Sequence, residues 1–148
     1  MKEKEFIVRQ ISVFLDNRPG SLAEMARYLA NKDINLRALS LAETRDFGTA
    51  RLIVADTANC VRALREGGYN FMETDVLAVE VVDRPGGMAD VLEIIADEQI
   101  NLEYVYATVG RITESAVIIL RVEDPGKAGI ILRAKGLKVL GEKEFELL

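Results

Sequence analysis

The sequence contains no histidine and only one cysteine, Cys60. A single cysteine cannot form an intramolecular disulfide. Without histidine the chain cannot build a Ser-His-Asp triad, a Cys-His pair or a mixed Cys/His zinc site. The acidic residues show no clustering that suggests a carboxylate metal site. We therefore expect a protein without a metal, a cofactor or catalytic residues, and not an enzyme.

Other scarce features narrow the class of protein. Only 6% of residues are aromatic, and no apolar run approaches the roughly 18 residues of a membrane span. No signal-like apolar segment follows the N-terminus, so the expected location is the cytoplasm. The 24 acidic residues outnumber the 19 basic ones, giving a net charge of −5. This balance argues against nucleic acid or an anionic membrane as a partner.

The composition that is present is that of a globular protein, with 49% hydrophobic and 29% charged residues. The chain has 148 residues, enough for one ordinary domain or two very small ones. An internal repeat favours the second possibility. Residues 18–20, Arg-Pro-Gly, recur at 84–86, and residues 34–36, Ile-Asn-Leu, recur at 100–102. The prolines (19 and 85) and the asparagines (35 and 101) are both 66 positions apart, so the two motifs keep one register.

Each copy contains the same series of predicted elements. Hydrophobic periodicity and turn residues predict strands at 7–15, 34–43, 48–55 and 69–75 in the first copy, with helices over about 22–29 and 57–66. The second copy has predicted strands at 76–82, 100–109, 115–122 and from 137 onwards, extended by 144–148, with helices over about 88–95 and 125–135. The connection near 110–114 joins its second and third strands. No flexible linker separates the copies, so we expect a fixed orientation between them.

The order strand, helix, strand, strand, helix, strand is the split βαβ, ferredoxin-like arrangement. We predict an α+β fold of two βαββαβ modules, residues 1–74 and 75–148. Each would have an antiparallel four-stranded sheet with helices on one face only. A module of about 70 residues is near the lower limit for an independent core. The uncovered sheet face or edge is therefore expected to contact the other copy or a second chain.

The turn after the first strand has the chemistry of an anion site. Pro19 suits a first helical position, and the backbone N–H groups of Gly20, Ser21 and Leu22 are expected to be free at the helix start. Gly20 and Gly86 lack a Cβ, so a ligand can approach the backbone. The helix dipole favours a carboxylate there.

Residues 16–22 followed by 33–36, and residues 82–88 followed by 99–102, resemble the signature of the ACT domain, a family of small-molecule and mostly amino-acid sensors. The signature joins an (Asp/Asn)-Arg-Pro-Gly turn to an amphipathic helix and then to an (Ile/Val)-Asn start of the second strand. It occurs twice in one register. The resemblance implies a stand-alone tandem ACT protein whose ligand site is shared between the turn of one module and the second-strand start of its neighbour.

Resemblance to serine-responsive ACT domains implies that Asn17 and Asn35 occupy two ligand-contacting positions, matched by Asp83 and Asn101 in the second copy. With the neighbouring backbone positions, the candidate ligand-binding residues are Asn17, Gly20, Ser21, Asn35, Leu36, Asp83, Gly86, Gly87, Asn101 and Leu102. An asparagine side chain both donates and accepts, which suits the ammonium and carboxylate groups of an amino acid. The alternative for Asn17 and Asp83 is helix capping.

The leading hypothesis is a regulatory protein that binds a free amino acid at the interface between ACT modules and signals to a partner enzyme or regulator. A homodimer is expected, because ACT modules associate side by side and sheet edges need covering. The alternative is a structural or protein-interaction module without a metabolite.

Two further classes stay open. Carboxylate acid–base chemistry would use Asp16, Asp83 or Glu43. An RNA-binding module would need exposed aromatics on its sheet, for which Tyr104 and Tyr106 are the only candidates.

Overall fold

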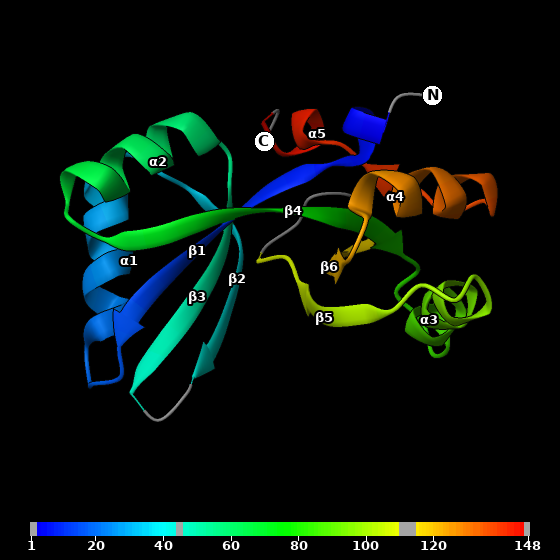
Figure 1. Ribbon diagram of the computed structural model, residues 1–148, viewed down its shortest axis with the longest axis horizontal. Helices are drawn as coiled ribbons and strands as arrows, with labels where there is room; N and C mark the ends of the chain where they lie inside the picture. The colour runs from blue at the N-terminus through cyan, green and yellow to red at the C-terminus, as the bar shows by residue number, and fades with distance from the viewer. Residues whose placement is uncertain (1–2, 44–45, 110–114, 147–148) are drawn as a thin grey trace.

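The computed structural model describes residues 3–43, 46–109 and 115–146, and its elements follow the predicted order twice (Figure 1). The first half contains the 3-10 turn η1 (Glu3–Phe6), β1 (Val8–Asp16), α1 (Ser21–Asn31), β2 (Leu36–Glu43), β3 (Phe47–Val54) and α2 (Thr57–Glu66). The long strand β4 (Asn70–Val81) follows. The second half contains α3 (Gly87–Asp97), β5 (Leu102–Ala107), β6 (Ala116–Val122), α4 (Pro125–Ala134), β7 (Val139–Leu140) and α5 (Glu142–Glu146). The predicted connections at 44–45 and 110–114 lie outside the described residues.

Alternation along the strands determines which face the helices cover. In β1, Ile11, Val13 and Leu15 are buried and pack against Met25 and Leu29 of α1. The two α1 residues are four positions apart, so they lie on one side of the helix. Residues at every second position therefore form the first module's core, and the intervening residues face the opposite side of the sheet.

The repeat is reproduced in the backbone. Gly20 and Gly86 precede α1 and α3 with φ of 87° and 86°, a conformation that favours glycine. Asp33 and Gln99, each two residues beyond the end of its helix, have φ of 59° and 56°. The residue pairing slips at Arg37, near the start of β2, and at Glu103, near the start of β5. All three pairs of positions are 66 apart, so both copies fold through the same local geometry.

β4 belongs to both modules. Its first part pairs with β1 from Asn70 to Val76, and its second part pairs with β6 from Leu77 onwards. The strands predicted at 69–75 and 76–82 are thus one continuous strand, and the two four-stranded sheets become one seven-stranded sheet with the order β2-β3-β1-β4-β6-β5 and β7 beside β4. A shared strand fixes the orientation of the two modules, as the absence of a linker predicts.

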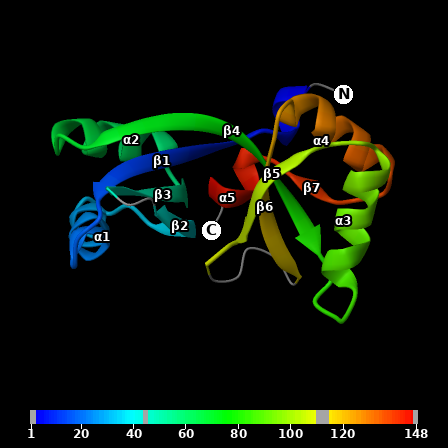
Figure 2. The ribbon, with the colours of Figure 1, turned by 60° about the horizontal axis from the view of Figure 1, so that its bottom comes forward.

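The sheet curls until its two end strands, β2 and β5, meet (Figure 2). One bridge joins Ala38 to Thr108, and the Val109 N–H donates to the Arg37 carbonyl oxygen at 2.7 Å. The face turned away from the helices encloses a core shared by both modules, formed by Val8, Ala38, Ile53, Val76, Ala78, Val117, Ile119, Leu140 and Phe145. Each module therefore covers the open sheet face of the other.

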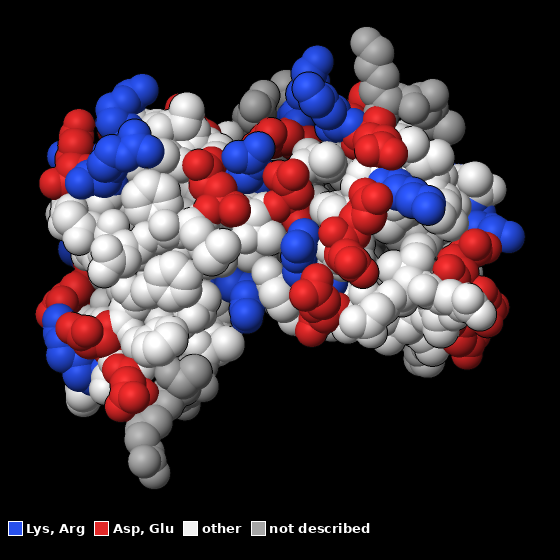
Figure 3. Space-filling model, in the orientation of Figure 1, with Lys and Arg blue, Asp and Glu red and all other residues white. Residues whose placement is uncertain are grey.

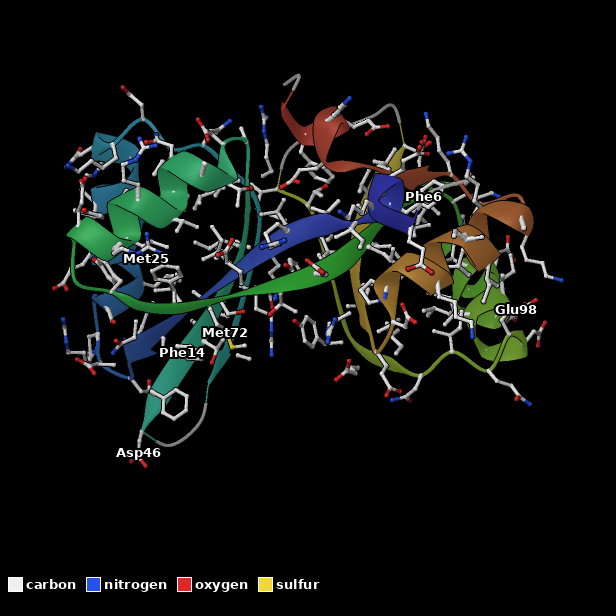
Figure 4. All side chains as sticks on the ribbon, turned by 45° about the horizontal axis from the view of Figure 1, so that its top comes forward. Phe6, Phe14, Met25, Asp46, Met72 and Glu98 are labelled. Carbon is white, nitrogen blue, oxygen red and sulfur yellow. The ribbon has the colours of Figure 1, made fainter. Side chains whose placement is uncertain are left out.

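The chain ends cross between modules. Phe6, before the first strand, is buried in the second module's core beside α4 (Figure 4). At the other end, Thr57 of α2 donates to Glu142 of α5 at 3.1 Å. The prediction of a final strand extended through 144–148 was wrong for residues 144–146, which lie in α5, and residues 147–148 lie outside the described part. No helix among the described residues is long and apolar enough to cross a membrane.

Candidate ligand-binding sites

The two Arg-Pro-Gly turns have the same ion pair. Arg18 pairs with Glu24 at 2.8 Å, and Arg84 pairs with Asp90 at 2.8 Å, each acid lying in the first turn of the following helix. The hydrogen bond and charge of Arg18 lower the pKa of the Glu24 carboxyl. Both arginines therefore neutralise acids of their own modules.

Contrary to the sequence prediction, Pro19 does not occupy the first position of its helix. Pro19 precedes the N-cap, which is Gly20, and α1 starts at Ser21; Gly86 is the N-cap of α3. The prediction of a free Ser21 N–H was wrong, because this group donates to the Arg18 carbonyl oxygen at 3.3 Å. The Gly87 N–H likewise donates to the Arg84 carbonyl oxygen at 3.0 Å. Since glycines occupy the N-caps, Asn17 and Asp83 do not cap these helices.

The first turn borders a hollow of about 60 Å³, which Asn17 and Ser21 line together with Leu41 and Gly48. A water molecule occupies about 30 Å³ of the liquid, so this space corresponds to roughly two waters. A shallow depression of about 200 Å³ lies beside it, near Tyr69. The turn is thus one wall of a possible site and does not enclose an amino acid by itself.

The second turn is tighter than the first. Gly87 takes the position of Ser21, and a Cβ added there would overlap the carbonyl oxygen of Val82. Strand and helix therefore approach each other more closely than in the first module. The two turns are not equivalent as ligand sites, although their backbone angles agree.

Asn35 and Asn101 are exposed and stand directly before Leu36 and Leu102, the first residues of β2 and β5. The Asn35 carbonyl oxygen accepts a hydrogen bond from the Ala55 N–H at 3.3 Å. Within the first module, the 11 residues of α1, about 16 Å of helix, separate this asparagine from the turn. α3 separates the corresponding groups of the second module.

Within one chain, the turn of one module also does not meet the strand-start asparagine of the other module. α1 and α3 lie at opposite ends of the molecule, and both views show this arrangement (Figures 1 and 2). Each predicted site residue therefore belongs to one of four separate surface regions of a single chain.

A different set of polar side chains lies together between the modules. The sequence analysis did not predict this cluster. Gln10 of β1 is fully buried, and its Nε2 donates to the Tyr104 hydroxyl at 2.8 Å and to Ser12 Oγ at 3.2 Å. Tyr106 donates to Gln10 Oε1 at 2.6 Å, and burial raises the pKa of the Tyr106 hydroxyl. The guanidinium of Arg51 lies over the Tyr104 ring, with its Cζ 3.8 Å from the ring centroid.

This arrangement bears on the RNA hypothesis. Tyr104 and Tyr106 are half-buried between the modules, and Arg51 occupies one face of the Tyr104 ring. Base stacking needs an accessible aromatic face on the sheet. The two tyrosines therefore do not form the exposed platform that this hypothesis requires.

The candidates for carboxylate chemistry are also dispersed. Asp16 is exposed at the end of β1, 4.0 Å from Arg18, and Asp83 lies in the second turn. The side chain of Glu43 lies outside the described residues. Within the described ranges, no three potential ligands among histidine, cysteine and acidic residues come together in a way that could hold a metal ion.

Comparison with known proteins supports the architecture. Residues 6–148 match a family model described as an ACT domain pair. A search of curated proteins finds no match.

Among solved structures, protein BT0572 from Bacteroides thetaiotaomicron is 31% identical with a TM-score of 0.87; the alignment covers 97% of this chain and 98% of that one. The regulatory subunit of aspartate kinase from Thermus thermophilus, in its ligand-free form, is 17% identical with a TM-score of 0.63. That alignment covers 90% of this chain and 93% of the subunit, and at this identity the likeness concerns the fold.

Proposed function

The chain belongs to the ACT domain pair family, and we propose that it senses a free amino acid at an interface between ACT modules and passes the signal to a partner enzyme or regulator. An ACT domain pair is a regulatory module and not a catalytic one, and it fills residues 6–148. The aspartate kinase regulatory subunit shows that this fold serves as a regulatory subunit in another protein. The proposal places the protein in the cytoplasm as a homodimer.

The observation that carries the proposal is the separation of the two halves of each candidate site. The turn with Asn17 and Ser21 borders a hollow of about 60 Å³ and a shallow depression of about 200 Å³, and Asn35 lies at the other end of α1. Enclosed small-molecule sites usually offer about 300–1,000 Å³. A second copy that brings its strand-start asparagine to this turn would complete the site. Ligand binding and association of two chains would then be coupled.

The shared strand supplies a route for the signal. β4 runs without interruption from the first module into the second, so a change in the pairing of one module alters the position of the other. A ligand shifts such an equilibrium only by its difference in affinity for the two arrangements. An interface site satisfies this condition, because its two halves separate when the arrangement changes.

The experiment is thermal unfolding of the full chain with each of the twenty amino acids at millimolar concentration. A ligand at about 100 times its Kd adds roughly 2.7 kcal/mol to the free energy of unfolding. For a chain of this size the midpoint should rise by about 5–10 °C. The rise should be lost in Asn35→Ala or Asn101→Ala. Asn31→Ala, an exposed asparagine at the end of α1, is the matched control.

Two outcomes decide against the proposal. No rise with any amino acid would leave the alternative, a structural or protein-interaction module. A rise at a protein concentration where light scattering finds only monomer would refute a site shared between two copies.

A further inference from the structure

Arg51 of β3 is a half-buried cation without an acidic partner. In the described part of the chain its guanidinium forms no hydrogen bond or ion pair, and it lies over the Tyr104 ring. Arg121, also half-buried, differs: it pairs with Glu103 at 3.3 Å and donates to the Asp75 carbonyl oxygen at 2.8 Å. An arginine stays charged inside a protein, so a half-buried one is expected to have an anion.

Buried hydrogen bonds hold the Tyr104 ring over which the Arg51 guanidinium lies. The fully buried Gln10 donates from Nε2 to the Tyr104 hydroxyl. The Tyr106 hydroxyl in turn donates to Gln10 Oε1. Tyr104 therefore presents a fixed ring face to the guanidinium. Stacking uses the face of the planar guanidinium and leaves the N–H groups at its edge available. Those edge N–H groups match the two oxygens of a carboxylate.

The register partners of Arg51 on β1 and β2 are polar and uncharged. Ser12 of β1 and Ser40 of β2 are its direct register partners, so the three side chains form one row on the same face of the sheet. The nearest acids of β4, Glu73 and Asp75, lie on the other face. There they pair with Arg9 at 3.2 and 3.0 Å. These two acids of β4 therefore do not pair with Arg51.

A second cation lies at the same junction. Arg37 of β2 has buried Nε and Nη2 atoms without a hydrogen-bond partner among the described residues. Its carbonyl oxygen accepts from Val109, just beyond β5. Three residues of strand, about 10 Å, separate Arg37 from Ser40 in the row. Two half-buried arginines of the first module thus lie at this junction, while the acid on β5, Glu103, pairs with Arg121.

We propose that this junction is a carboxylate-binding site in which Arg51 binds the carboxylate of the sensed small molecule, with Ser40 as a hydrogen-bonding neighbour. The site lies between β3 of one module and β5 of the other, distinct from the turns and strand starts. In the space-filling view the outline is hollowed between the modules, where Figure 1 shows β2 and β3 opposite β5 (Figure 3). A ligand there contacts both modules. The inference rests on the proposed sensing function and extends it, because it assigns the Arg51 guanidinium as the group that binds the ligand carboxylate.

The first test uses the amino acid that gives the largest thermal shift, titrated by calorimetry into the full chain. Arg51→Met keeps an apolar stem on Tyr104 and removes the donors; it should weaken binding about 10- to 100-fold. Arg51→Lys keeps the charge without the planar edge, and should weaken it about tenfold. The α-amide of the same amino acid should bind the natural protein as weakly as the acid binds Arg51→Met. Arg62→Met, an exposed arginine of α2, is the control and should have no effect.

The outcomes separate this inference from the proposed function. Loss of binding in Asn35→Ala with unchanged binding in Arg51→Met would overturn the junction site and leave the sensor intact. If no amino acid binds, the sensor proposal fails, and the junction is tested with sodium acetate. The readout is the Arg51 Nε–Hε nuclear magnetic resonance signal, assigned by its absence in Arg51→Met, with Arg62 as reference. A saturable shift of Arg51 alone supports the site, and no selective shift overturns it.

Discussion

The hydroxyl of Tyr106 in β5 donates a 2.6 Å hydrogen bond to Oε1 of Gln10 in β1, so a side chain of the second module satisfies a fully buried amide of the first. The other end of that amide donates to Tyr104. A buried polar group that loses its partner costs free energy, because water cannot replace the bond. This bond therefore makes module pairing specific, in addition to the apolar core that surrounds it.

Tyr106→Phe should lower the free energy of unfolding by about 1–3 kcal/mol, because Gln10 Oε1 loses its donor while the ring remains. Urea unfolding measures this loss. In a Gln10→Met background the same change should cost much less, since the acceptor is already gone. Tyr28→Phe removes a hydroxyl that donates to the Ala63 carbonyl oxygen at 2.6 Å within the first module. Its effect should simply add to that of Gln10→Met, and equal coupling for both tyrosines would refute the assignment.

Phe6→Ala should destabilise the protein by about 3–5 kcal/mol, as expected for a buried aromatic side chain. Phe6 belongs to the second module's core, although it precedes the first strand. The unfolding midpoint in urea measures the effect. Phe47→Ala is the control, because Phe47 is 44% exposed and should cost much less. A small loss for Phe6→Ala would mean that the N-terminal turn does not seal the second module.

Gly129→Ala should destabilise the protein, although alanine is favoured over glycine in a helix by about 1 kcal/mol. A Cβ at Gly129 of α4 would lie 2.6 Å from the Cβ of Phe6. The alanine therefore displaces η1 from the helix. When Phe6 is absent, in a chain that begins at residue 7, the same change should become neutral or stabilising. A change of sign between the two backgrounds, followed by thermal unfolding, is the diagnostic result.

Much of the fold can be predicted from this sequence because local signals and the repeat agree. The helix predicted over 57–66 is α2 with the same bounds, and the order of elements follows from periodicity. The shared strand was predicted as two, since no residue near Asp75 marks a break or a continuation. Phe6 lies in the second module's core and Phe145 in the core that both modules share, and tertiary packing determines both positions. An apolar residue near a chain end gives no sign of which core it enters.

The candidate sites show the same division. The backbone geometry of the turns was predictable in part, because Gly20 and Gly86 occupy positions that favour glycine. The amide of Ser21 was expected to be free, but the turn uses it internally. The cluster of Gln10, Arg51 and Tyr104 could not be predicted, because its members lie far apart in sequence. Only the curled sheet brings them together.

The free energy of unfolding should fall more steeply with pH above 9 in the natural protein than in Cys60→Ala. Cys60 of α2 is fully buried, and burial, with a smaller effect of Asp56, raises the pKa of its thiol from 9.0 to about 12. Between these values the unfolded chain loses a proton that the native chain keeps, so stability decreases as pH rises. Urea unfolding in reducing buffer at pH 8, 9, 10 and 11 measures the difference between the two proteins. A constant difference across this range would contradict a buried neutral thiol.

Arg37→Met should raise the free energy of unfolding in the absence of ligand, by about 1 kcal/mol or more. The Nε and Nη2 atoms of Arg37 are buried without a partner in the part of the chain that the structure describes, and methionine fills similar space without a charge. Arg121→Met is the matched comparison, because it breaks an ion pair with Glu103 and a hydrogen bond to the Asp75 carbonyl oxygen. This second change should destabilise the protein in the same urea experiment. If Arg37→Met raises the free energy of unfolding while Arg121→Met lowers it, the charge of Arg37 destabilises the native fold. Such a charge is expected where an anion binds. Equal destabilisation by both would show that Arg37 already has its partner in the native protein.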